Sequence, residues 1–115
     1  MLEQISENIS NFFLAEKINE NSVRIQSPFY IINTPLEYNI IVTQKDEELI
    51  IHDGGTLVQD INEQKLYIDQ NNLVKLLERY PNLSYTDNII RLKTNMDDLV
   101  CDIAKFIQIL TIIIN

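Results

Sequence analysis

Hydrophobic residues recur at helical spacing at both ends of the chain. Near the N-terminus, Leu2, Ile5 and Ile9 alternate with charged and polar residues, and the pattern predicts an amphipathic helix over residues 2–16. The C-terminal pattern is longer and continues without a gap over residues 96–114. In its last turns hydrophobic residues also occupy the other side, so we expect this helix to be covered on both sides.

β-Branched residues dominate the segment between these helices. Residues 23–32 have a strand pattern, which Pro28 interrupts as a bulge or an edge position would. After a turn predicted at residues 33–35, segments 40–43 and 49–52 flank a short charged turn, an arrangement typical of a β-hairpin. The hydrophobic character of these strands is continuous, which suggests that both faces of the sheet are at least partly covered.

A short helix is expected to begin at Thr56. This residue lies three positions before Gln59, which is the spacing of a capping box. The segment that follows, residues 65–68, is either a further short strand or an apolar link.

The second half of the chain predicts one more helix and one more hairpin. Asp69 or Asn71 can cap a helix that Pro81 ends. Residues 84–92 have the pattern of a small hairpin that turns at Asp87-Asn88.

The strands cluster and do not alternate with helices, which predicts an α+β fold with an antiparallel sheet. The expected order is an N-terminal helix, a hairpin-rich sheet, a short helix after the Asp-Gly-Gly turn, a middle helix, a small hairpin and a long C-terminal helix. A length of 115 residues is that of one ordinary domain, so residues 1–115 are expected to form a single domain.

Composition narrows the class of protein. Hydrophobic residues make up 45% of the chain and charged residues 23%, which is globular composition. The 17 acidic residues against 9 basic ones give a net charge of −8, which argues against direct binding to nucleic acid. A single cysteine excludes an internal disulfide and a multi-cysteine metal site, and we expect no metal and no cofactor.

The N-terminus lacks the basic and hydrophobic regions of a signal peptide. The hydrophobic run at residues 106–114 is shorter than the roughly 20 residues that a membrane-spanning helix needs. We therefore expect a cytoplasmic protein with no membrane association.

The most distinctive local pattern is a strand that leads into two glycines and a helix start, formed by His52, Asp53, Gly54, Gly55 and Thr56. Glycine provides the positive φ that a sharp turn needs, and such a turn can also present backbone amides to an anion. Because no lysine adjoins the helix start, as it would in a phosphate-binding loop, a purely structural turn is the favoured interpretation.

His52-Asp53 invites an acid–base hypothesis, but successive residues of a strand point to opposite faces, so these two side chains are not expected to pair.

Cys101 has no basic neighbour in sequence that would stabilise a thiolate. A free cysteine is usually a small buried hydrophobic residue, and inert packing is its expected role.

Asp53, Glu63 and Lys65 resemble the Asp…Glu-x-Lys set of metal-dependent nucleases. In those enzymes two carboxylates hold a magnesium ion and a lysine helps to position the attacking water. A small metal-dependent nuclease or hydrolase is therefore an alternative hypothesis, although the lack of basic surface for DNA argues against it.

Acidic residues are concentrated between Glu37 and Asp69, where eight of them face only two lysines. One interpretation is a solvated surface that keeps the protein soluble. The other is a negative surface that docks on a positive one, with carboxylates in place of phosphates. For this second interpretation the expected contact residues are Asp46, Glu47, Glu48 and Asp53.

Three segments resemble a small prokaryotic and phage family of unknown function: Val23–Phe29 with its Pro-Phe pair, Ile40–Val42, and Leu49–Leu57 with its Asp-Gly-Gly-Thr-Leu turn. The order of the C-terminal elements also fits that family. Tyr30, Asn33 and Asn39 stand here where acidic residues are expected, and His52 where an aspartate is more usual. The resemblance implies a fold and no established activity, and it encourages a role between phage and host.

The leading hypothesis is a non-enzymatic acidic module that binds another protein. Its partner would be a basic, nucleic-acid-binding host defence effector, inhibited in the manner of an anti-CRISPR protein. A third hypothesis is a structural homodimer through the C-terminal helix, with an interface formed by Phe106, Ile109, Ile112 and Ile113.

Overall fold

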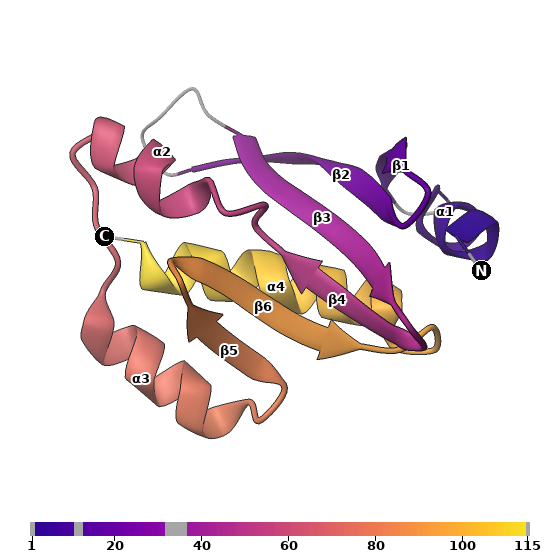
Figure 1. Ribbon diagram of the computed structural model, residues 1–115. Helices are drawn as coiled ribbons and strands as arrows, with labels where there is room; N and C mark the ends of the chain where they lie inside the picture. Colours follow the sequence, from indigo (N-terminus) through magenta and orange to yellow (C-terminus); the bar gives the residue numbers. More distant parts are fainter. Residues whose placement is uncertain (1, 11–12, 32–36, 115) are drawn as a thin grey trace.

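The computed structural model describes residues 2–10, 13–31 and 37–114, and these form an α+β fold (Figure 1). In chain order the elements are α1 (Leu2–Ser10), β1 (Leu14–Asn19), β2 (Ser22–Tyr30), β3 (Glu37–Lys45), β4 (Glu48–His52), α2 (Leu57–Glu63), α3 (Gln70–Arg79), β5 (Leu83–Thr86), β6 (Ile89–Thr94) and α4 (Leu99–Ile113). This order confirms the predicted fold class.

The strands form one antiparallel sheet in the order β1-β2-β3-β4-β6-β5. The chain leaves the sheet after β4, forms α2 and α3, and returns to add β5 at the far edge and β6 beside β4. As a result, segments far apart in the sequence lie side by side in the centre of the sheet. In particular, His52 at the end of β4 pairs with Ile41 of β3 on one side and with Arg91 of β6 on the other.

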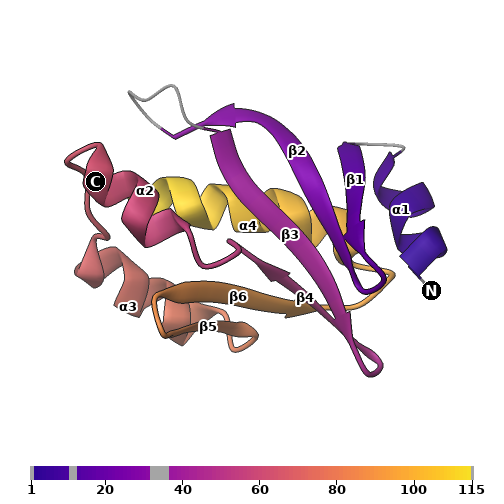
Figure 2. The same cartoon turned by 45° about the horizontal axis from the view of Figure 1, so that its top comes forward.

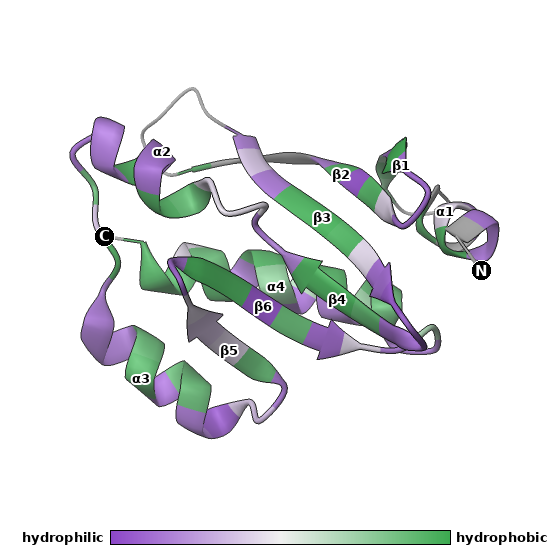
Figure 3. Ribbon diagram, viewed as in Figure 1, coloured by the Kyte–Doolittle hydropathy of each residue, from purple (hydrophilic) through white to green (hydrophobic). Residues whose placement is uncertain are grey.

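Helix α4 packs against one face of the sheet. It lies behind β4 and β6 in Figure 1 and behind β3 in Figure 2. Val42, Ile51 and Leu92 are successive cross-strand partners on this face, and all three are buried. Phe106 and Ile103 of α4 are fully buried and belong to the same hydrophobic core. Figure 3 shows the hydrophobic residues along the centre of the sheet and along α4, where the core lies.

No described helix covers the opposite face of the sheet, which we call the open face (Figure 1). The alternation of side chains along each strand assigns to it Leu14, Glu16, Ser22, Arg24, Gln26, Glu37, Asn39, Ile41, Thr43, Lys45, Glu48, Ile50, His52, Ser84, Thr86, Ile89, Arg91 and Lys93. The expectation that both faces are covered is therefore wrong as far as the described helices are concerned. The isoleucines of the open face are half-buried by their neighbours on the sheet.

The N-terminal helix is shorter than the predicted residues 2–16. Helix α1 ends at Ser10, and residues Leu14–Asn19 form strand β1, which pairs with β2. Ala15, Glu16 and Lys17 are residues that favour helix locally. Pairing with an otherwise unpaired strand edge supplies backbone hydrogen bonds that outweigh this weak preference.

The predicted interruption at Pro28 is present in strand β2. The register between β2 and β3 shifts between Gln26 and Tyr30. Strand β1 pairs with β2 only as far as Gln26, so Pro28 lies beyond that pairing. Both expected features are therefore present: an irregular register with β3 and an edge without a paired strand on the β1 side. The predicted turn at residues 33–35 lies outside the described residues.

Both predicted hairpins are confirmed. The β3–β4 turn contains Asp46 at φ 58°, and the β5–β6 turn contains Asp87 and Asn88 at φ 53° and 60°. In the β5–β6 turn both central residues have positive φ, which is the geometry of a type I′ turn, for which aspartate and asparagine are suited.

Helix α2 begins at the predicted position, but the Thr56 side chain does not cap it as predicted. Thr56 makes no side-chain bond to the amides of the first turn, and its Oγ1 instead donates to the carbonyl of Asp53 at 3.3 Å. The predicted capping box with Gln59 is therefore wrong.

Asp69 does cap α3, by accepting a hydrogen bond from the Asn72 amide at 3.0 Å. Residues 65–68 are a link, except that Ile68 forms one isolated bridge with Ile114.

Within the described ranges, none of the helices combines the length and the apolarity needed to cross a lipid bilayer.

Candidate functional site

The Asp-Gly-Gly turn joins the end of β4 to α2 and is held by side chains from β3, from β4 and from the turn itself. His52 Nδ1 accepts a hydrogen bond from the Gly54 amide at 3.0 Å, and Asp53 Oδ1 accepts one from the Gly55 amide at 2.7 Å. From β3, the Asn39 side chain donates to both the Asp53 carbonyl and Thr56 Oγ1, each at 3.3 Å. The two glycine amides are therefore used inside the turn, and this supports the structural interpretation over anion binding.

Both glycines adopt positive φ, at 71° and 78° for Gly54 and Gly55. Gly54 is also constrained by space. A Cβ at this position would lie 2.7 Å from Asn39 Nδ2 and 2.9 Å from Ile41 Cδ1. A Cβ at Gly55 would meet only Ile89, at an ordinary contact distance of 3.5 Å. Glycine is thus required more strongly at position 54 than at position 55.

The imidazole of His52 is held by hydrogen bonds at both ring nitrogens. Since Nδ1 accepts from Gly54, the neutral ring carries its proton on Nε2 and donates it to Thr43 Oγ1, 2.9 Å away. Thr43 in turn lies 2.9 Å from Ser22 Oγ. Burial lowers the pKa of His52, and the positive charge of Arg91 lowers it further. This environment favours a neutral imidazole whose two nitrogens are both used in hydrogen bonds within the chain.

Asp53 points into the core side of the sheet and is only 1% exposed. One carboxylate oxygen is bonded to the Gly55 amide, while the other, Oδ2, is buried without a hydrogen-bond partner. Burial raises the pKa of the Asp53 carboxyl, and the backbone amides of Gly55 and Ile90 and the charge of Arg91 oppose that rise. Asp53 therefore cannot contact a partner from its present position, which corrects its assignment to a binding surface.

The other three predicted contact residues, Asp46, Glu47 and Glu48, are exposed at the β3–β4 turn. The loop before α4 lies beside them, because Leu49 pairs with Thr94. Glu48 and Asp98 accordingly line the same hollow of about 230 Å³. We call Asp46, Glu47, Glu48, Asp97 and Asp98 the acidic end of the sheet. Asp97 and Asp98 are not among the contact residues expected from the sequence.

The acidic end is rigidly built and poorly neutralised. The Asn95 side chain accepts from the Asp98 amide at 2.9 Å and donates to the Asp98 carboxylate at 3.0 Å. In the described part of the chain, the only cation within 4 Å of these five carboxylates is Lys93, whose Nζ lies 3.8 Å from Glu48. That pair is exposed on both sides, so it contributes little to stability.

The structure does not assemble the alternative nuclease set. Asp53 is enclosed in the core, while Glu63 is exposed at the end of α2, where its carboxylate accepts from Gln59 Nε2 at 3.3 Å. Lys65 is exposed in the link that follows, at φ 61°. Among the described residues, no three His, Cys, Asp or Glu side chains are grouped closely enough to hold a metal ion.

Cys101 is exposed on α4, and this corrects the expectation that it is buried. Its helix lies on the core side of the sheet, whereas His52 lies on the open face. The two side chains are therefore separated by the sheet and cannot form a cysteine–histidine pair.

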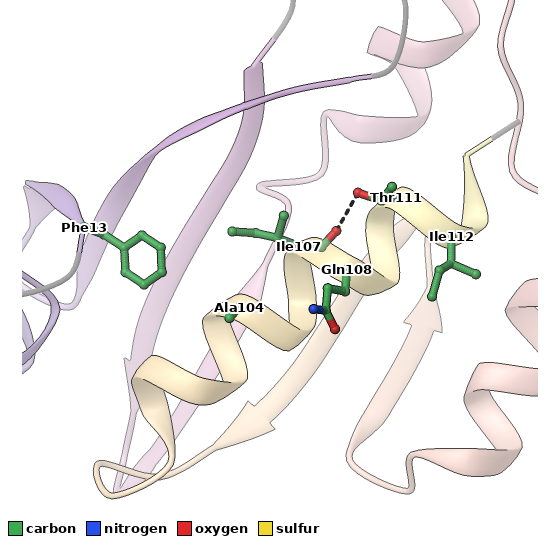
Figure 4. Close-up of a pocket in the computed structure, with 6 residues that line it drawn as sticks. All are labelled: Phe13, Ala104, Ile107, Gln108, Thr111 and Ile112. Carbon is green, nitrogen blue, oxygen red and sulfur yellow. Dashed lines mark hydrogen bonds between the residues drawn. The ribbon is translucent and has the colours of Figure 1, made fainter.

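Of the four residues predicted at a homodimer interface, three belong to the core of the single chain. Phe106, Ile109 and Ile113 are buried, and only Ile112 is substantially exposed, at 49%. Ile112 lies at one end of an apolar groove of about 460 Å³, shown in Figure 4, whose other lining residues include Phe13, Ala104, Ile107, Gln108 and Thr111. Dimerisation stays a prediction, but the three buried residues are not available to a second copy.

No protein-family model, no curated protein and no solved structure matches this chain. The resemblance to a phage and prokaryotic family therefore gains no support from these comparisons, and function has to be argued from the residues themselves.

Proposed function

We propose that this protein is a binding module that recognises a basic protein through its acidic end. The observation that carries the proposal is that Glu48 and Asp98, about fifty residues apart in sequence, line the same hollow, with the exposed Asp46, Glu47 and Asp97 next to them along the chain. The β3–β4 turn supplies Asp46, Glu47 and Glu48, and the loop before α4 supplies Asp97 and Asp98.

The geometry suits recognition of a positively charged surface. The carboxylates are carried by a hydrogen-bonded hairpin and a helix start, so little conformational entropy is lost when they bind. They are largely unpaired within the chain, so binding does not first have to break internal ion pairs. Complementary charge speeds encounter and disfavours acidic competitors.

More specifically, the proposed partner is a nucleic-acid-binding protein, and these carboxylates take the place of the phosphates that it normally binds. Arginine and lysine side chains arranged for phosphates also accept carboxylates, because both groups are oxyanions that take charge-assisted hydrogen bonds. Blocking such a surface would make the protein an inhibitor.

Affinity capture from the native host with two matched variants tests the proposal. The first variant carries Asp46→Lys, Glu47→Lys and Glu48→Lys. The control carries Glu3→Lys, Glu63→Lys and Glu78→Lys, which are exposed acids on three helices and give the same change of net charge. Partners recovered by the wild type and the control, but bound at least about tenfold more weakly by the first variant, support the proposal. Equal recovery by both variants contradicts it.

A further inference from the structure

Basic residues are distributed very differently from acidic ones over this molecule. The open face carries four of the nine basic residues, Arg24, Lys45, Arg91 and Lys93, but only three of the seventeen acidic ones. Those three, Glu16, Glu37 and Glu48, lie at its perimeter: on the edge strand β1 and at the first residues of β3 and β4. Glu16 is the cross-strand partner of Arg24, and Glu48 is the partner of Lys45 and lies 3.8 Å from Lys93. The cross-strand partners of Arg91 are His52 and Ser84, so positive charge is least compensated at the centre of the open face, in a chain of net charge −8.

A continuous row of side chains crosses this centre. Arg24, Ile41, His52 and Arg91 are successive cross-strand partners on β2, β3, β4 and β6. Arg91 is anchored by Nη1, which donates to Thr86 Oγ1 at 2.8 Å and to the Thr86 carbonyl at 3.3 Å. The row therefore combines positive charge with a fixed geometry.

Aliphatic side chains fill the space between these cations. Ile50 and Ile89 line a hollow of about 300 Å³ together with Lys45, His52 and Arg91. Both isoleucines are half-buried by their neighbours on the sheet. An apolar centre with a charged rim is the usual composition of a protein-binding surface.

We propose that the open face is a second protein-binding surface, and that its occupant is a protein segment in which carboxylates surround aliphatic side chains. Burial of the isoleucines supplies affinity, and the four cations select acidic over basic sequences. Glu48 offsets part of the charge of Lys45 and Lys93, whereas acidic residues more than about 8 Å from the open face are largely screened at physiological salt. The open face borders the acidic end at Glu48, but the proposal does not require the acidic end to be a binding site.

Two other occupants fit the open face less well. Single-stranded nucleic acid is bound on sheets by stacking on aromatic side chains, and the open-face residues of β1, β3, β4, β5 and β6 include no Phe, Tyr or Trp. A second copy packed face to face would bring the same four cations against each other, which is unfavourable.

Nuclear magnetic resonance of the full chain tests the proposal, with a short peptide of alternating leucine and glutamate as the probe. We expect amide shift changes centred on Ile41 and His52 and confined to β2, β3, β4 and β6. The double variant Arg24→Glu/Lys45→Glu is expected to weaken binding at least about tenfold. The control Lys75→Glu/Arg79→Glu, with the same charge change on exposed positions of α3, is expected to bind within about twofold of the wild type.

Ile50→Thr tests the apolar contribution, since threonine keeps the β-branched shape that a strand accepts, and about fivefold weaker binding is expected.

Several outcomes overturn the proposal. These are no shift changes with the peptide at millimolar concentration, equal changes with a leucine–lysine peptide, the same changes with oligothymidylate, and changes at these residues when the protein alone is diluted. The last two would identify the occupant as nucleic acid or as a second copy.

Discussion

His52 and Asp53 are consecutive in the chain, yet their side chains lie on opposite faces of the sheet. The imidazole of His52 bonds to Thr43 on the open face, and the carboxyl of Asp53 is enclosed on the core side. Each still accepts a hydrogen bond from one glycine amide of the same turn. Two titrating groups with oppositely shifted pKa values therefore support one backbone turn.

The chain has a single histidine, so its ring signals in a proton spectrum are unambiguous. A pH titration should place the pKa of His52 below the usual value of about 6.5. Arg91→Gln should raise that pKa, because it removes the positive charge opposite the ring, but burial should keep it below the usual value. A pKa that does not respond to Arg91→Gln would show that this charge has no influence on the ring.

His52→Asn tests whether the lowered pKa of His52 makes stability depend on pH. Asparagine can accept from the Gly54 amide but cannot titrate, and it loses the bond to Thr43, which costs about 1 kcal/mol. Because the unfolded wild type binds a proton more readily than the folded one, the wild type loses stability as pH falls below about 6.5. The advantage of the wild type in urea unfolding should therefore be largest near pH 8 and shrink toward pH 5. A constant difference would contradict this.

Asp53→Asn should change the pH dependence of stability in the direction opposite to His52→Asn. The pKa of Asp53 is raised by burial, so the folded wild type holds its proton to higher pH than the unfolded chain and loses stability as pH rises through the folded pKa. From pH 4 to pH 7 the unfolding free energy of the wild type should therefore fall relative to that of Asp53→Asn. Asp97→Asn, an exposed site on the loop before α4, controls for the change of charge.

Gly54→Ala and Gly55→Ala should destabilise the protein to different extents. Both variants pay the cost of a left-handed backbone, about 1–2 kcal/mol. At Gly54 the new Cβ also displaces Asn39, which bonds to Asp53 and Thr56, and this adds about 1 kcal/mol. Urea unfolding of both variants measures the difference, and equal losses would show that Asn39 does not matter.

Phe106→Ala and Ile112→Ala separate the core of α4 from its surface. Phe106 is fully buried, and its truncation should cost about 3–5 kcal/mol. Ile112 is 49% exposed, and its truncation should cost less than about 1 kcal/mol in a monomer. If Ile112→Ala lowers stability more strongly, and does so in a manner that depends on protein concentration, then a second copy covers this position.

Much of the fold could be predicted from local patterns. The hairpin at residues 84–92, the cap at Asp69 and the long C-terminal helix follow from turn residues and from the spacing of hydrophobic residues. Strand β1 could not, because Ala15, Glu16 and Lys17 prefer helix locally, and only the edge of β2 makes them a strand. The local signal and the tertiary pairing disagree there, and the pairing decides.

For the candidate sites, the amino-acid sequence by itself determined the glycine turn, the acidic β3–β4 turn and the opposite orientation of His52 and Asp53, because each depends on local geometry. Only the tertiary structure decided that Asp97 and Asp98 join the acidic turn, and that Arg91 faces His52. Both depend on the return of β6 to the side of β4, after α2 and α3. A pairing across about forty residues is determined by the packing of the whole core and leaves no signal in either segment alone.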